Sequence, residues 1–95
     1  MGQNFAPVFI DPSPKPNIFL GCFIEYNIDY RGNDIVNMVV DTHQACADFC
    51  ASTPGGLFWT FGVDMWCYIK SSSSGRKTNQ ETTSGNRKCG KIGNM

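Results

Sequence analysis

Five cysteines in a chain of only 95 residues limit most strongly what this chain can fold into. So short a chain buries too little apolar surface to be very stable, and small proteins of oxidising compartments compensate with disulfides. A reduced intracellular protein with buried cysteines is the alternative, and such cysteine density is rare there. We therefore expect one extracellular, disulfide-stabilised domain. The cysteines are Cys22, Cys46, Cys50, Cys67 and Cys89.

The middle of the chain predicts a short helix that carries two of these cysteines. Cys46 and Cys50 are four residues apart, so on a helix they lie on one face, one turn apart. Asp41 or Thr42 can cap the first turn, because either side chain can accept a hydrogen bond from an unpaired amide. The helix should end at the TPGG sequence of residues 53–56, since proline cannot continue it and glycine tolerates left-handed backbone.

Strand-like runs lie on both sides of this helix. The GVD sequence at residues 62–64 predicts a tight hairpin turn between two of them. Residues 71–83 are rich in Ser, Thr, Asn and Gln, which predicts a long polar loop. The expected strands are Ile18–Tyr26, Ile35–Val40, Leu57–Phe61, Met65–Lys70 and Ser84–Gly90.

Several motifs occur together in a fixed order. They are GNDI after Cys22, CADFC on the helix, PGGLFWTF and CYIK in the hairpin, and SG shortly before Cys89. This set resembles the PAN/Apple domain family over about residues 20 to 90, and looks closest to the compact Apple modules of apicomplexan microneme adhesins. The resemblance implies an α+β fold, a small disulfide-stabilised module with an antiparallel sheet of about five strands packed against one short helix.

The resemblance also implies a disulfide pattern. The family usually has six cysteines, paired first to sixth, second to fifth and third to fourth. Carried over to this chain, Cys22 pairs with Cys89 and Cys46 pairs with Cys67. Cys50 is then left as an unpaired thiol, because Gly56 stands near the position of the missing cysteine.

The expected domain boundaries follow from composition. Residues 1–17 contain three prolines in five residues and predict an N-terminal linker or arm. The domain takes residues 18–91, and residues 92–95 form a tail. No apolar run approaches the roughly 20 residues of a membrane span, so we expect no membrane insertion. Residues 1–10 lack the pattern of a signal peptide, which predicts an excised module or a processed product. The resemblance implies secretion by way of the microneme.

No catalytic or metal-binding constellation is visible. His43 and Cys50 could share a helix face, but no third orienting group accompanies them. A zinc site would have to combine these two residues with Cys46 and Cys67, and the usual C-x-x-C spacing is missing. We therefore predict that the chain is not an enzyme and uses neither a metal nor a cofactor. We also expect no nucleic-acid partner.

Alternation along the hairpin predicts which side chains could meet a ligand. If Cys67 faces the helix, the residues on either side of it face away. With Phe58 from the preceding strand they would form an outer apolar patch, with a basic residue beside it. Aromatic rings stack on sugars, and a lysine donates to hydroxyls or sulfates. The alternative is that another strand or the N-terminal arm covers this patch. The candidate ligand-binding residues of this outer patch are Phe58, Trp66, Tyr68 and Lys70.

Basic residues are concentrated in the last quarter of the chain, although the net charge is zero. This asymmetry predicts either affinity for sulfated glycans or a set of separately solvated charges, and we favour the second interpretation. The residues are Lys70, Arg76, Lys77, Arg87, Lys88 and Lys91.

The predicted function is an extracellular adhesive binding module that contacts a protein or a cell-surface carbohydrate. The resemblance implies a role in host-cell attachment, as one unit of a multi-Apple microneme adhesin. The isolated domain is expected to be a monomer. The competing hypothesis is a structural spacer or assembly module of a tandem array, with no ligand of its own.

Overall fold

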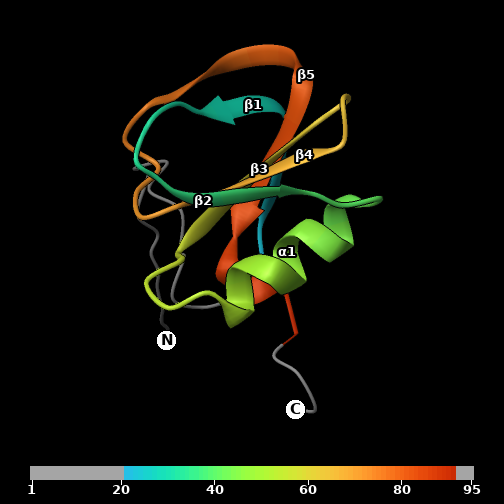
Figure 1. Cartoon of the computed structure of the whole chain (residues 1–95). Coiled ribbons are helices and arrows are strands. Elements are labelled where there is room, and N and C mark those ends of the chain that lie inside the picture. The colour runs from blue at the N-terminus through green and yellow to red at the C-terminus, as the bar shows by residue number, and fades with distance from the viewer. Residues whose placement is uncertain (1–20, 92–95) are drawn as a thin grey trace, which may run out of the picture.

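The computed structural model describes residues 21–91, in which a five-stranded antiparallel sheet packs against one α-helix (Figure 1). This confirms the α+β fold that was predicted. The elements follow in the order β1 (Ile24–Tyr30), β2 (Asp34–Val39), α1 (His43–Ser52), β3 (Phe58–Gly62), β4 (Trp66–Lys70), β5 (Arg76–Asn86) and a 3-10 turn, η1 (Arg87–Cys89).

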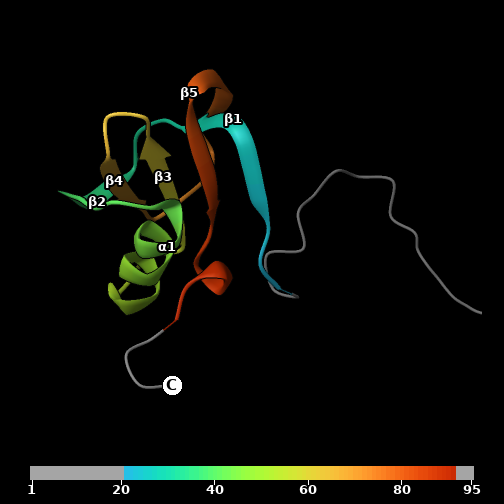
Figure 2. The same ribbon diagram turned by 90° about the vertical axis from the view of Figure 1, so that its right-hand side faces the viewer.

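The strand order across the sheet is β1-β5-β3-β4-β2, so β1 and β2 are the two edges. The helix α1 covers the β3–β4 part of one face, which we call the inner face. On the opposite, outer face, β1 and the first half of β5 arch over the sheet (Figures 1 and 2). A bulge at Asn27, which has a φ of 64°, bends β1 and helps to produce this arch.

Side chains close both ends of α1. The hydroxyl of Thr42 accepts a hydrogen bond from the amide of Ala45 at 3.0 Å, so Thr42 and not Asp41 is the cap. At the other end, the guanidinium of Arg87 donates to the carbonyl of Ala51 at 2.8 Å and to that of Gly56 at 2.7 Å. Arg87 thereby binds a carbonyl group that the end of a helix leaves without an intrahelical partner.

The core lies between α1 and the inner face of the sheet. Trp59 is fully buried, and its indole N–H donates to the carbonyl of Asn86 at 3.0 Å. The ring of His43 stacks on this indole with 6.0 Å between centroids, and His43 is half-buried. The other buried residues of the core cluster are Cys46, Ala47, Cys50, Cys67 and Ile69.

Both disulfides that the resemblance implied are formed. Cys22 is bonded to Cys89 and ties the chain before β1 to η1, whereas Cys46 is bonded to Cys67 and ties α1 to β4. Because Cys46 and Cys67 are bonded to each other, they are not available to the zinc site that we considered. Cys50 is free and buried, and burial raises the pKa of its thiol to about 12. A buried thiol of this kind is unreactive.

Three expectations about the strands were wrong. The polar segment 71–83 is not one long loop, because β5 begins at Arg76 and runs to Asn86. The segment is a strand because it pairs with β1 and β3, and its polar composition gives no local signal of that pairing. The last strand also ends earlier than predicted, with η1 carrying Cys89. The first strand begins at Ile24 and not at residue 18; residues 18–20 lie outside the described part.

Candidate functional site

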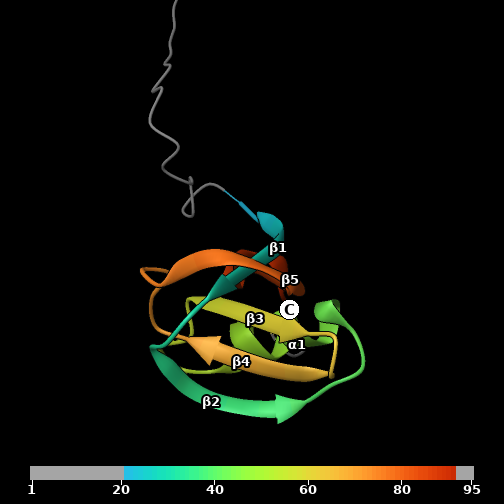
Figure 3. The same cartoon turned by 90° about the horizontal axis from the view of Figure 1, so that it is seen from above.

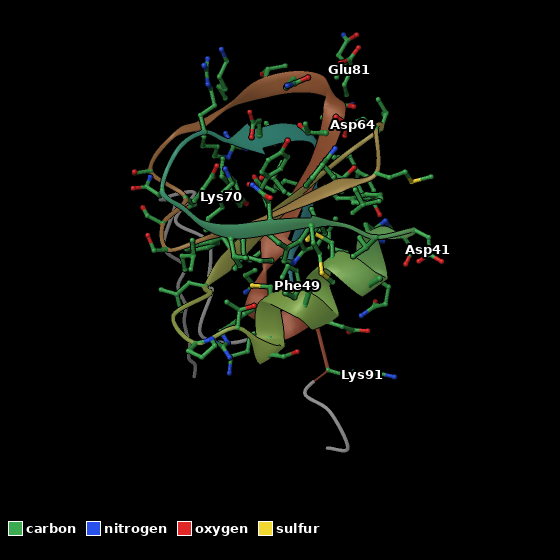
Figure 4. The ribbon with its side chains drawn as sticks, viewed as in Figure 1. Asp41, Phe49, Asp64, Lys70, Glu81 and Lys91 are labelled. Atoms are coloured by element: carbon green, nitrogen blue, oxygen red, sulfur yellow. A yellow bond between two sulfur atoms is a disulfide. The ribbon has the colours of Figure 1, made fainter. Side chains whose placement is uncertain are left out.

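A polar cavity of about 370 Å3 opens on the outer face of the sheet. Figure 4 places Lys70, Asp64 and Glu81 on this side of the molecule, and Phe49 of α1 on the other. Three segments line the cavity. They contribute Asp29, Arg31, Gly32 and Asp34 from the end of β1, the start of β2 and the turn between them, Thr60, Gly62, Val63, Asp64, Tyr68 and Lys70 from the β3–β4 hairpin, and Asn79, Glu81 and Thr82 from β5.

An outward bulge of β5 forms one wall of the cavity. Between the paired positions Tyr26–Thr83 and Ile28–Thr78, β5 carries four residues, 79–82, where β1 carries only Asn27. The extra residues fold onto themselves: the side chain of Asn79 accepts from the amide of Glu81 at 2.9 Å. The carbonyl of Glu81 in turn accepts from the amide of Val63 at 3.0 Å, which joins this wall to the β3–β4 turn.

A chain of hydroxyl groups holds the arch onto the centre of the sheet. The amide of Tyr30 donates to the hydroxyl of Thr60 at 3.3 Å, and this hydroxyl lies 2.8 Å from that of Ser84. The hydroxyl of Ser84 donates to the carbonyl of Ile28 at 2.6 Å, so the proton between the two hydroxyls comes from Thr60. Thr60 and Ser84 are 2% and 0% exposed, which means that water cannot replace these bonds.

Replacing Thr60 with valine should therefore destabilise the domain and loosen the cavity floor. The change keeps the shape of the side chain but leaves the amide of Tyr30 and the hydroxyl oxygen of Ser84 without this partner. We expect the free energy of unfolding to fall by about 1–3 kcal/mol. Urea unfolding monitored by circular dichroism measures the change. Thr60→Ser, which keeps the hydroxyl, is the control, and equal stabilities of the two variants would contradict the assignment.

Lys70 lies in the cavity wall with its charge already paired. Its side chain is 5% exposed and its ammonium group forms an ion pair with the carboxylate of Asp34. The same nitrogen donates to the carbonyl of Gly32 at 3.2 Å and lies 5.4 Å from the centroid of the Tyr68 ring. Lys70 thus positions Tyr68 and the β1–β2 turn, and it has little charge left to attract an anion.

Acidic groups outnumber basic groups in the cavity lining. The lining has two basic residues, and one of them, Lys70, is paired with Asp34. The remaining charges are one positive group, Arg31, and three carboxylates. The excess of negative charge repels anionic ligands, whereas carboxylate oxygens accept hydrogen bonds from hydroxyl or ammonium groups. The four carboxylates belong to Asp29, Asp34, Asp64 and Glu81.

The four predicted ligand-binding residues do not form one surface. Tyr68 and Lys70 line the cavity. Trp66 stacks on Tyr68 with 6.4 Å between centroids and is 38% exposed, but it does not line the cavity. Phe58 is 5% exposed, because it packs against Tyr30 at 5.5 Å between centroids. Phe58 is therefore not part of an exposed patch, and at this position the alternative applies, in which another strand covers the patch.

Sequence reasoning missed the acidic and amide residues of the cavity. Asp29 was assigned to no element, and Asn79 and Glu81 fell in the segment that was interpreted as a loop. No hydrophobic periodicity marks them, since the residues of β5 before Thr82 are mostly exposed. Only the strand pairing brings residue 29 next to residue 77 of β5, and that pairing is not readable from local pattern.

The basic residues near the C-terminus do not gather into one cluster, and so they do not support a site for sulfated glycans. Arg76 and Arg87 lie at opposite ends of β5. Lys70 is paired with Asp34, and the guanidinium of Arg76 donates to both carboxylate oxygens of Glu25 in a second ion pair. The contacts of Arg87 with carbonyl groups of the α1 end use its donors as well.

An ion pair fastens the arch at the edge of the sheet. The carboxylate of Glu25 accepts hydrogen bonds from Arg76 and from the hydroxyl of Tyr30. The hydrogen bond from Arg76 lowers the pKa of Glu25 below its usual value of 4.5. Burial and the neighbouring carboxylate raise the pKa of Tyr30. Glu25 is therefore charged, and Tyr30 protonated, at neutral pH.

Stability should consequently fall in acid in a way that depends on Glu25. A carboxyl group with a lowered pKa in the folded state stabilises above its unfolded pKa and loses this effect as the pH falls through the folded pKa. Below about pH 4.5, we expect the free energy of unfolding of the wild type to fall by up to about 1 kcal/mol more than that of Glu25→Gln. The effect is small because Arg76 is half exposed, so water screens the ion pair. Thermal unfolding from pH 7 to pH 3 tests this. Parallel pH profiles for the two proteins would contradict it.

Comparison with known proteins finds similarity to one protein family in the centre of the chain. The family model of the PAN domain matches residues 28–74, which include β2, α1, β3 and β4. Domains of this family generally bind proteins or carbohydrates and are not enzymes. A search of curated proteins gave no match. Within residues 21–91, no helix is long and apolar enough to cross a membrane.

Proposed function

We propose that the chain is an extracellular adhesive binding module of PAN/Apple type, and that its ligand binds in the outer-face cavity. The PAN match at residues 28–74 and the two disulfides support an extracellular binding module. The observation that carries the proposal is the cavity of about 370 Å3 lined by polar groups and by Tyr68. At a finer level, we propose that the module is one unit of a multi-Apple microneme adhesin and takes part in host-cell attachment.

The chemistry of the lining favours a neutral, hydroxyl-rich ligand, such as the terminal sugar of a glycan. Carboxylate and amide oxygens of Asp29, Glu81 and Asn79 can accept hydrogen bonds from sugar hydroxyls, and the ring of Tyr68 offers a face for stacking. Sialylated and sulfated sugars carry the same sign of charge as the cavity. A polar, uncharged segment of a partner protein has chemistry close to that of the neutral sugar.

Binding of the folded domain to an array of galactosylated, sialylated and sulfated glycans tests the proposal, at low and at physiological salt. We expect binding to neutral galactosylated glycans, weaker or no binding to the two anionic classes, and little change with salt. Preference for sulfated glycans that disappears with salt would instead assign binding to surface lysines. That outcome would overturn the assignment to the cavity.

Two cavity variants and one control make the test specific to the site. Tyr68→Ala removes the stacking surface, and Glu81→Gln removes one carboxylate of an exposed residue in the cavity wall. Both should weaken binding by about tenfold or more, which corresponds to roughly 1.4 kcal/mol. Asp41→Asn is the control, because it also turns a carboxylate into an amide. Asp41 lies beside α1 and away from the cavity (Figure 4), so this change should leave affinity unchanged. Equal affinities of all four proteins would exclude the cavity as the binding site.

The alternative is a spacer or assembly module with no ligand of its own. Burial of Cys50 removes one argument for it, because a buried thiol cannot form a bridge to another chain without unfolding. A folded domain that binds neither glycans nor any other extracellular module of its parent protein would favour the spacer hypothesis.

A further inference from the structure

Strand β2 is an edge of the sheet with an unusually apolar and open surface. In the described part of the chain it is paired with β4 alone, and Figure 3 shows no element beyond it. All six of its residues are exposed. Together with the first residue of β4 and the residue before it, β2 presents exposed apolar side chains on both faces of this edge. These are Ile35, Val36, Met38, Val39, Met65 and Trp66, which are 38–57% exposed.

Half of the main-chain groups of β2 point out of the sheet. Val40 donates to the carbonyl of Met65 at 3.0 Å, and the register pairs Met38 with Cys67 and Val36 with Ile69. In an antiparallel ladder, residues two apart point their amide and carbonyl groups to the same side. The main-chain groups of residues 36, 38 and 40 therefore form hydrogen bonds with β4. The main-chain groups of Asn37 and Val39 point away from β4. These outward groups can pair with another strand.

The usual protection of an exposed edge is missing from β2. Edge strands commonly carry lysine, proline or charges that prevent pairing with another chain. The sequence DIVNMV contains no lysine and no proline, and its one charge, Asp34, is paired with Lys70. Asp41 is the next acidic residue and lies beyond the end of the strand.

From these observations we infer that β2 pairs with β2 of a second copy of the chain, in an antiparallel arrangement centred on Asn37. In this register the two Asn37 residues face each other, Val36 lies opposite Met38 of the other copy, and Ile35 lies opposite Val39. The outward main-chain groups then bond across the axis, and apolar side chains meet on both faces. No two like charges stand directly opposite, since Asp34 falls opposite Val40. The strand is thus complementary to itself, which selects a second copy as the partner.

The proposed dimer has two consequences. One short strand pair buries little surface, so we expect weak association, with a Kd on the order of 100 µM. The isolated domain would be monomeric at low micromolar concentration, as the sequence suggested, and would dimerise when crowded on a surface. Antiparallel pairing keeps the two outer faces on one side, so both cavities would face the same way. The inference does not depend on what the cavities bind.

Sedimentation equilibrium of the full chain between about 10 µM and about 1 mM tests the proposal. We expect a reversible monomer–dimer equilibrium in the wild type. Val39→Lys places a charge on the edge and should weaken the dimer at least tenfold. Asn37→Pro removes an amide that points out of the sheet, as edge strands tolerate, and should do the same. Val63→Lys is the control, because Val63 is 73% exposed at the β3–β4 turn and away from the edge.

Two results would overturn the inference. One is a wild type that remains monomeric at about 1 mM. The other is association that Val39→Lys and Val63→Lys weaken equally, since the contact would then lie elsewhere or depend on general hydrophobicity. Circular dichroism of each variant establishes that it is folded, and the two lysine variants keep the prediction testable if Asn37→Pro does not fold.

Discussion

Removal of the Cys46–Cys67 disulfide is expected to cost the domain most or all of its stability. This bridge joins α1 to β4 inside the core, both of its cysteines are 0% exposed, and it closes a loop with a sequence separation of 21 residues. The loop-entropy model assigns about 3 kcal/mol to such a bridge. Typical domains are stable by only about 5–15 kcal/mol, and a chain of this size lies near the lower end.

The double variant Cys46→Ala and Cys67→Ala should therefore unfold at least about 10 °C below the wild type, or be unfolded at about 37 °C. Differential scanning calorimetry measures the shift. Cys50→Ala is the matched control: it also truncates a buried cysteine of the core but breaks no bridge, and it should lower the unfolding temperature much less. Similar losses in both proteins would mean that packing of the sulfur atoms, and not the covalent link, stabilises the core.

Replacing Trp59 with alanine is expected to have the second large effect. Trp59 is the largest fully buried side chain, it stacks on His43, and its N–H donates to Asn86. The backbone of Gly85 approaches the ring so closely that a Cβ there would lie 2.5 Å from it. Removal of the ring leaves a cavity under both β5 and α1, and such changes cost about 3–5 kcal/mol.

The second tryptophan provides the control for this prediction. Trp66 is 38% exposed and rests on Tyr68 at the surface, so Trp66→Ala should lower the free energy of unfolding by about 1 kcal/mol or less. Urea unfolding of both variants, followed by circular dichroism, gives the comparison. A loss in Trp66→Ala as large as in Trp59→Ala would show that the core is not centred on Trp59.

The sequence predicted the elements whose signals are local. Cysteines four residues apart, a capping residue and a TPGG stop define the helix, and the alternation around the GVD turn defines the β3–β4 hairpin. Once Cys67 is placed toward the helix, the same alternation directs its neighbour Trp66 away from it, and Cys67 is 0% exposed whereas Trp66 is 38% exposed. The disulfide pairs came from the resemblance to PAN/Apple domains, because spacing alone does not select among the pairings of five cysteines.

The parts that the sequence could not predict depend on contacts between distant segments. β5 has the composition of a loop, and it is a strand because β1 and β3 pair with it on both sides. The cavity arises where the β5 bulge at residues 79–82 faces Tyr68 and Lys70, and no motif marks that encounter. Phe58 was assigned to an exposed patch because alternation cannot reveal that Tyr30, from an arching edge strand, covers the outer face.

The central claim, that the outer-face cavity binds the ligand, is tested most directly by amide chemical shifts of the isotope-labelled domain during titration with galactose or lactose. The account predicts saturable shifts for residues of the cavity lining, such as Thr60, Asp64, Tyr68 and Glu81, and none for α1, with the shifts lost in Tyr68→Ala. Shifts confined to α1 or to β2, or shifts that persist unchanged in Tyr68→Ala, would contradict it.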